Sequence, residues 1–225
     1  MVGRLRGFAL AMLLTAPKWD FNKYQADLFQ GDIWGVSEHF HVGCNVLDIG
    51  ANRGLFTAFC GVNGAHITAY EPHPEAYKSL VRTIQLNGIE NQVSAIEAAV
   101  WIYSGTTKLD ISTTPYANST ISDGISNRNN YPEENVLGYE VPCITLSDAI
   151  ANNKWDIVKM DIEGAEFPVL LNCPDLVLSH IKFLTVELHH KNDVVGVEYT
   201  QLLEKLQKTF DLQKTEGWAV FATQK

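Results

Sequence analysis

Acidic residues and glycines stand at the ends of short apolar runs in this chain, where an α/β protein places its ligand-binding groups. Four such runs lie at 45–49, 66–70, 157–161 and 183–188. The first leads into a glycine turn, and the other three carry carboxylates at their carboxyl ends. Because the carboxyl ends of parallel strands meet at one edge of a sheet, we expect these residues to form one site.

The first run continues as DIGANRG, a strand that feeds a glycine turn and then a helix. Glycine lets the backbone turn sharply and lets a ligand approach closely, and the N–H groups of a new helix suit an anion. The dinucleotide fingerprint G-x-G-x-x-G is incomplete, because Asn52 replaces the middle glycine and Gly54 comes one residue early. The turn therefore indicates a nucleotide-like ligand without specifying which one.

Glu71 follows the second run, 21 residues after Gly50. A carboxylate at this place can accept hydrogen bonds from both hydroxyls of a ribose. NAD and S-adenosylmethionine (SAM) both contain a ribose, so Glu71 is compatible with either cofactor. Its place between a strand end and the prolines Pro72 and Pro74 favours a ligand-binding role over a surface role.

The last two runs supply groups for acid–base chemistry. Three carboxylates follow or end the third run: Asp161, Glu163 and Glu166. Such acids can favour a cationic sulfonium, orient a substrate hydroxyl or act as a base, whereas Glu166 can also simply stabilise the first turn of a helix. Glu187 lies within the fourth apolar run, so it needs a partner or lines a cleft. His189 or His190 can act as a general base near neutral pH.

Strands and helices that alternate along the chain must position these residues. Further strands are expected at 93–100, 210–212 and 218–223, and helices at 55–60, 74–86 and 197–209. This alternation predicts an α/β fold with a mostly parallel sheet that helices cover on both faces. Residues 104–141 break the rhythm, so we expect a lid, a substrate loop or a disordered segment there.

The composition is that of an ordinary globular protein, with 46% hydrophobic and 19% charged residues. The net charge is −9 and only 17 residues are Lys or Arg, which argues against a nucleic-acid partner. The four cysteines form no CxxC pair, so we expect reduced thiols and a cytoplasmic location.

Residues 1–42 are expected to form a helical extension ahead of a domain at 43–225. Two arginines precede a short apolar stretch at 7–16, which resembles a signal peptide but lacks a clear A-x-A cleavage site. The stretch is too short to span a bilayer, so no firm membrane insertion is expected. We favour a helix that lies on the domain or at a contact between copies of the chain.

Four segments together resemble the FkbM family of SAM-dependent methyltransferases. They are VLDIGANRGLF, AYEPHPEAY, VKMDIEGAEFPVL and FLTVELHH, in that order, and the resemblance covers about residues 43–225. It implies a Rossmann-like class I methyltransferase with a seven-stranded, mostly parallel sheet whose last strand is antiparallel. It also implies SAM as cofactor and O-methylation of a hydroxyl on a sugar, a glycan or a secondary metabolite.

The resemblance also assigns roles to individual residues. Asp48, Gly50, Asn52 and Gly54 would hold the methionine part of SAM, Glu71 the ribose, and Glu97, Ala98 and Ala99 would lie near adenine. Asp161, Glu163 and residues 187–189 would face the acceptor. An alcohol is a poor nucleophile, so we expect His189 as base, with Asp161 and Glu163 holding the acceptor and Asp161 also facing the sulfonium. The alternative is a divalent metal, such as Mg²⁺, bound by Asp161 and Glu187.

Two other functions remain open on the sequence alone. A nicotinamide-dependent oxidoreductase could use a similar sheet, but the missing middle glycine disfavours it. A degenerate methyltransferase fold could serve as a binding subunit, but the intact acids at 48, 71 and 161 argue against decay of the site. The sequence leaves open the identity of the acceptor, the need for a metal and the oligomeric state.

Overall fold

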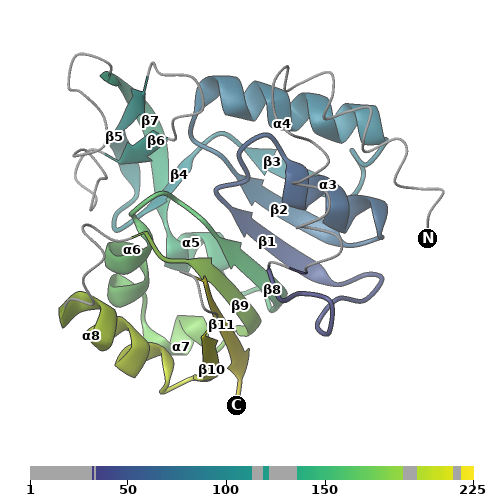
Figure 1. The fold of residues 1–225 in the computed structure, drawn as a ribbon. Helices are drawn as coiled ribbons and strands as arrows, with labels where there is room; N and C mark the ends of the chain where they lie inside the picture. Colours follow the sequence, from purple (N-terminus) through teal and green to yellow (C-terminus); the bar gives the residue numbers. More distant parts are fainter. Residues whose placement is uncertain (1–31, 33, 113–118, 122–135, 190–196, 215–218) are drawn as a thin grey trace.

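A twisted seven-stranded sheet forms the centre of the molecule (Figure 1). The computed structural model describes residues 32, 34–112, 119–121, 136–189, 197–214 and 219–225. The sheet strands are β1 (Asn45–Ile49), β2 (His66–Tyr70), β3 (Val93–Ile96), β8 (Trp155–Met160), β9 (Ile181–Glu187), β10 (Phe210–Lys214) and β11 (Ala219–Gln224). Their order is β10-β11-β9-β8-β1-β2-β3, and all pairs are parallel except those that β11 makes with β9 and β10. The predicted sheet, with its last strand antiparallel, is confirmed.

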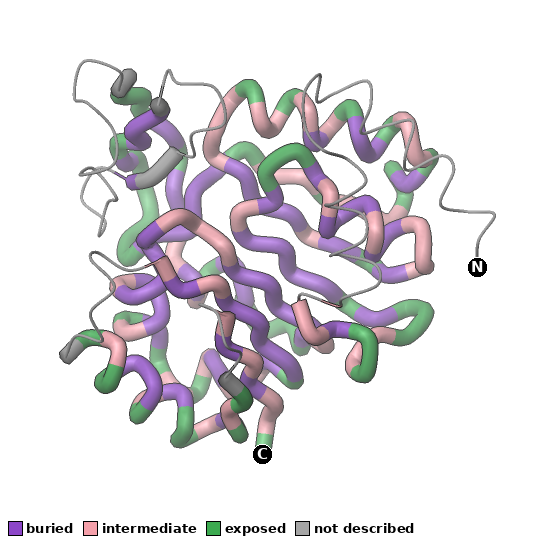
Figure 2. The backbone as a smooth tube through the Cα atoms, in the orientation of Figure 1, coloured by how far each residue is buried: buried purple, intermediate pink, exposed green. Residues whose placement is uncertain are grey.

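Helices cover both faces of this sheet, as the sequence predicted. On one face lie α3 (Leu55–Val62) and α4 (Pro74–Asn87); on the other lie α5 (Leu146–Ile150), α6 (Glu166–Asn172), α7 (Asp175–Leu178) and α8 (Val197–Leu206). Alternate residues of β1 serve the two faces: Val46 packs with α3 and α4, whereas Leu47 packs with the other set. The central strands β1 and β8 are therefore buried over most of their length (Figure 2).

Helix α4 shows how local sequence sets these elements. Pro74 occupies its first turn, and His73 Nδ1 accepts a hydrogen bond from the backbone N–H of Glu75. Gly88 ends the helix in the left-handed region at φ 63°, which is the usual role of glycine after a helix. The sequence predicted this helix within one residue at its carboxyl end.

A second, four-stranded sheet replaces much of the irregular segment expected at 104–141. It consists of β4 (Ala99–Trp101), β5 (Gly105–Ser112), β6 (Ser119–Ile121) and β7 (Val136–Thr145), in the order β4-β7-β5-β6. The prediction of one strand at 93–100 was also wrong, because the chain leaves the main sheet after β3. Alternate residues of β5, including Leu109 and Ile111, are buried in the core, a period-two signal obscured by the polar residues around it. Residues 113–118 and 122–135 lie outside the described residues.

Only part of the expected helical extension can be compared with the structure, because residues 1–31 and 33 lie outside the described residues. Residues 34–42 form turns and contain no helix. Val36 is buried, and Trp34 and Phe40 pack against the core that contains α3 and α4. In the part of the chain that the structure describes, no helix is long and apolar enough to cross a membrane.

Candidate active site

Backbone hydrogen bonds join the carboxyl ends of the central strands. The N–H groups of Gly50 and Ala51 both donate to the carbonyl of Tyr70 at 3.0 Å. The N–H of Asp161 donates to the carbonyl of Ile49 at 3.1 Å. The loops that follow β1, β2 and β8 therefore lie side by side, as the sequence predicted for its acidic and glycine residues.

The loop after β1 depends on a glycine at position 50. Gly50 has φ +79°, and a Cβ atom there would lie 1.8 Å from the backbone oxygen of Asp161. Two residues with side chains also adopt positive φ in these loops: Asn52 at 49° and Glu163 at 55°. Such conformations are costly for residues other than glycine, and they concentrate at functional sites.

Glu71 holds the loop after β1 to the end of β2. Its Oε2 accepts a hydrogen bond from the N–H of Asn52 at 2.7 Å, and its Oε1 accepts one from the N–H of His73 at 2.8 Å. Each carboxylate oxygen can accept a further hydrogen bond, as two ribose hydroxyls require. Burial raises the pKa of Glu71 to about 7, although the two backbone N–H groups oppose this shift.

The amino end of α3 fits an anionic group such as the carboxylate of an amino acid. Gly54 precedes the helix at φ 86°, makes no side-chain capping hydrogen bond, and leaves the first turn without an acidic residue. The first N–H groups of a helix lack partners within the helix and attract negative charge. Together with the carboxylate of Glu71, these groups suit a ligand that combines an amino acid with a ribose.

Asp48 points into the protein rather than toward the sheet edge, with none of its surface exposed. Its Oδ2 accepts a hydrogen bond from Thr57 Oγ1 at 2.6 Å, and its Oδ1 lies 3.4 Å from Lys159 Nζ. Asp48 therefore contacts Thr57 and Lys159 and presents no surface to a ligand in this conformation. The role of Lys159 was missed by sequence reasoning, although a lysine within an apolar strand was a visible signal.

His189 lies at the centre of an acidic cluster beyond the end of β9. Its Nδ1 is 2.9 Å from Glu166 Oε1, and its Nε2 is 3.4 Å from Glu163 Oε2. The same Nε2 lies 3.9 Å from both Asp161 Oδ1 and Glu187 Oε1. The structure thus brings together four of the residues predicted for the acceptor side, and it adds Glu166.

Glu166 is the member of this cluster for which the sequence left open a functional role or a role in the first turn of a helix. It is fully buried, and its two oxygens accept the backbone N–H groups of Ile162 and Gly164 at 2.9 and 3.0 Å. A carboxylate held in this way fixes the orientation of the His189 ring. His190 lies outside the described residues.

The charges of the cluster shift the titration of its members. Burial alone would lower the pKa of His189, but the hydrogen bond to Glu166 and the surrounding carboxylates raise it to about 10. Burial raises the pKa of Glu163 to about 7, opposed by the charge of His189, and burial and Asp161 raise the pKa of Glu187. His189 is therefore protonated at neutral pH in this arrangement.

The three residues expected near adenine lie where β3 ends and the chain crosses to the second sheet. Glu97 is exposed, whereas Ala98 and Ala99 are buried. Ala99 begins β4 and pairs with Cys143 of β7. Of the three, only Glu97 presents a polar side chain to solvent at the carboxyl end of β3.

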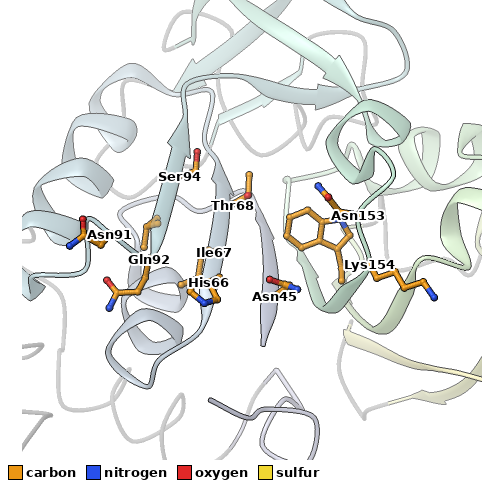
Figure 3. A pocket seen from close by; sticks show the side chains of 11 residues that line it. Asn45, His66, Ile67, Thr68, Asn91, Gln92, Ser94, Asn153 and Lys154 are labelled. Atoms are coloured by element: carbon orange, nitrogen blue, oxygen red, sulfur yellow. The ribbon is translucent and has the colours of Figure 1, made fainter. Parts of the chain in front are cut away.

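A polar pocket of about 530 Å³ lies at the opposite edge of the sheet (Figure 3). Asn45, His66 and Trp155 line it, and each is the first residue of its strand. Lys154 and Asn153 form a further part of its wall. Because the glycine and acidic loops follow the other ends of these strands, this pocket is separate from the candidate active site.

Residues 48–212 match the family model described as "Methyltransferase FkbM domain". The chain belongs to the FkbM methyltransferase family. It is a SAM-dependent methyltransferase, and the resemblance noted in its sequence motifs is confirmed. This membership decides against the nicotinamide-dependent alternative.

The chain is also similar to a curated methyltransferase and to two solved structures. The chain is 25% identical over 201 residues to methyltransferase sdnD of Sordaria araneosa. This match covers 77% of this chain and 76% of that protein. Its fold is similar to a protein assigned as an rRNA methylase from Clostridium thermocellum, with TM-score 0.51, 12% identity, and coverage of 87% and 97% of the two chains. A protein assigned as an O-methyltransferase from Klebsiella pneumoniae gives TM-score 0.50, 10% identity, and coverage of 99% and 90%. At these identities the two structures support the fold alone.

Proposed function

We propose that this methyltransferase transfers the methyl group of SAM to a hydroxyl oxygen of a neutral sugar, glycan or secondary metabolite. The observation that carries the proposal is the cluster of three carboxylates around His189 Nε2, next to the cofactor loop. Carboxylates accept hydrogen bonds from hydroxyl groups and repel phosphates. The net charge of −9 acts in the same direction, against a nucleic-acid acceptor.

The cofactor is assigned to the loops after β1 and β2. Glu71 would accept the ribose hydroxyls, and the turn from Gly50 through Asn52 to Gly54 would hold the methionine part at the start of α3. Asp48 supports this turn from inside the protein, and Glu97, Ala98 and Ala99 remain the proposed neighbours of adenine. When bound, SAM supplies a methyl group on a positively charged sulfur and leaves as a neutral thioether.

The acceptor hydroxyl must lose a proton as its oxygen bonds to the methyl carbon. The sequence suggested His189 as the base, yet the surrounding carboxylates keep its imidazole protonated at neutral pH, with a pKa of about 10. Glu163 Oε2 lies 3.4 Å from His189 Nε2. We therefore assign proton uptake to the Glu163–His189 pair, in which the Glu163 carboxylate takes the proton while Asp161 orients the hydroxyl.

A divalent metal is the second way to activate the hydroxyl, and one observation favours it. Asp161, Glu187 and His189 each offer a ligand atom, and these atoms lie within 4.8 Å of one another. Binding of Mg²⁺ or a similar ion would displace the proton from His189. Exhaustive dialysis against EDTA distinguishes the two routes: activity survives it if the Glu163–His189 pair acts alone, and requires added metal otherwise.

A methyl-transfer assay with tritiated SAM tests the proposal against sugars, glycans, small alcohols and RNA. We expect O-methylated product from a hydroxyl acceptor. Glu163→Gln and His189→Ala should slow turnover strongly and leave the affinity for S-adenosylhomocysteine within about twofold. Glu90→Gln, an exposed carboxylate just before β3, is the matched control. Methylation of RNA alone, or full activity of Glu163→Gln, would overturn the proposal.

The surroundings of the cysteines support the expected reducing, cytoplasmic location. Cys44, Cys60, Cys143 and Cys173 are all buried free thiols. A homo-oligomer also remains a proposal, and sedimentation of the purified chain measures it directly.

A further inference from the structure

Lys159 is a charged residue next to the carboxyl end of β8, a buried parallel strand. It lies on β8 directly opposite Asp48 of β1, and its side chain is only 5% exposed. Removing a lysine from water is costly unless its charge is paired and its N–H groups are bonded. The position therefore calls for a specific role, which the acid–base chemistry proposed above does not supply.

The ammonium group of Lys159 joins the two loops that carry the site. Its Nζ donates a hydrogen bond of 2.7 Å to the carbonyl oxygen of Gly50, the first residue of the cofactor loop. The same atom lies 3.4 Å from Asp48 Oδ1 and 3.6 Å from Asp161 Oδ2, at the start of the acceptor loop. One positive charge thus bridges the carboxyl ends of β1 and β8.

The contacts around Lys159 keep it charged and in place. Burial opposes its charge, but Asp48 and Asp161 outweigh this effect and raise its pKa. The ring of Trp34 lies 5.0 Å from Nζ, so the segment before β1 covers the ammonium with an aromatic face. Trp34 in turn packs edge-on against Phe56 of α3.

We infer that Lys159 is a positioning residue that clamps the Gly50 carbonyl of the cofactor loop and the Asp161 carboxylate of the acceptor loop to one point of the sheet. The inference rests on the proposed use of the Gly50–Gly54 turn for SAM. The Gly50 carbonyl oxygen is partly buried and accepts the hydrogen bond from Lys159 Nζ, so removal of the ammonium would leave this acceptor without that donor at a cost in free energy. Without the clamp, the turn would lose the shape that presents the start of α3 to a ligand.

The test separates the clamp from a general loss of stability. Lys159→Met alone leaves Asp48 buried without its cation, so the informative variant is Lys159→Met/Asp48→Asn, compared with Asp48→Asn. Lys182→Met is the control. Lys182 also forms an ion pair with an aspartate, since its Nζ lies 2.6 Å from Asp156 Oδ1, but its side chain is exposed on the neighbouring strand β9. Circular dichroism establishes that each variant is folded. Calorimetry with S-adenosylhomocysteine and hydrogen exchange of the loop amides are then measured.

Relative to Asp48→Asn, the double variant should bind S-adenosylhomocysteine at least tenfold more weakly. The amides of Gly50, Ala51 and Asn52 should exchange at least tenfold faster, while amides in the centre of β1 do not change. A folded double variant that keeps both values within twofold of Asp48→Asn would overturn the inference. If the wild-type protein fails to bind S-adenosylhomocysteine, the proposed function fails, and hydrogen exchange alone decides whether Lys159 is a clamp.

Discussion

Replacement of Glu71 by glutamine should separate cofactor binding from folding. Both oxygens of Glu71 already accept a backbone N–H, from Asn52 at 2.7 Å and from His73 at 2.8 Å. The side-chain amide in Glu71→Gln would turn an N–H group toward one of these donors and would lose an acceptor for a ribose hydroxyl. A hydrogen bond to a charged group contributes roughly 1.5–3 kcal/mol, so affinity for S-adenosylhomocysteine should fall about 10-fold to 150-fold.

The same substitution predicts a change in pH dependence. Burial raises the pKa of Glu71 to about 7, and only the ionised carboxylate offers both oxygens as full acceptors. About one tenth of Glu71 is ionised one pH unit below its pKa, so wild-type affinity should fall roughly tenfold from pH 8 to pH 6. The affinity of Glu71→Gln should change little over this range.

Isothermal titration calorimetry with S-adenosylhomocysteine at pH 6, 7 and 8 measures both effects. Glu75→Gln is the matched control, because Glu75 lies four residues away, is exposed and forms an ion pair with Lys78 at 2.6 Å. Its affinity should stay within twofold of wild type. Wild-type affinity in a folded Glu71→Gln, or an unchanged pH dependence, would refute the assignment of Glu71 to the ribose.

Three further predictions concern the packing around the site. Gly50→Ala places a Cβ 1.8 Å from the oxygen of Asp161, so it should lower Tm by several degrees and weaken S-adenosylhomocysteine binding; a wild-type Tm contradicts this geometry. Thr57→Val removes the hydroxyl that donates to buried Asp48 at 2.6 Å, so urea titration should show a free energy of unfolding about 1–3 kcal/mol lower. An unchanged free energy of unfolding would mean that water replaces the hydroxyl. Burial raises the pKa of all four cysteine thiols, so Ellman's reagent should react with them slowly in the native protein and fully in guanidinium; rapid native reaction would show that they are accessible.

Sequence reasoning succeeded where one short segment contains the whole signal. The apolar run before Gly50 and the prolines after Glu71 marked a strand end and a helix start, and both appear in the structure. It failed for the second sheet, because the alternation of β5 spans only a few residues within a polar segment. A pattern this short also cannot show which segment pairs with β5, and its partner β7 begins much later in the chain, at Val136.

The sequence by itself determined the strands of the main sheet and which residues stand at their carboxyl ends, because apolar periodicity and glycine act locally. Tertiary structure alone decided which side chains meet. Lys159 reaches Gly50 across 109 positions of sequence, and Glu166 reaches His189 across 23. Those contacts follow from the register of β1 with β8 and from the packing of α6. They determine the charge states of these side chains, which cannot be read from any one segment of the sequence. For this reason the sequence located the acidic edge of the sheet, whereas the fold decided that His189 is protonated there and that Asp48 faces inward.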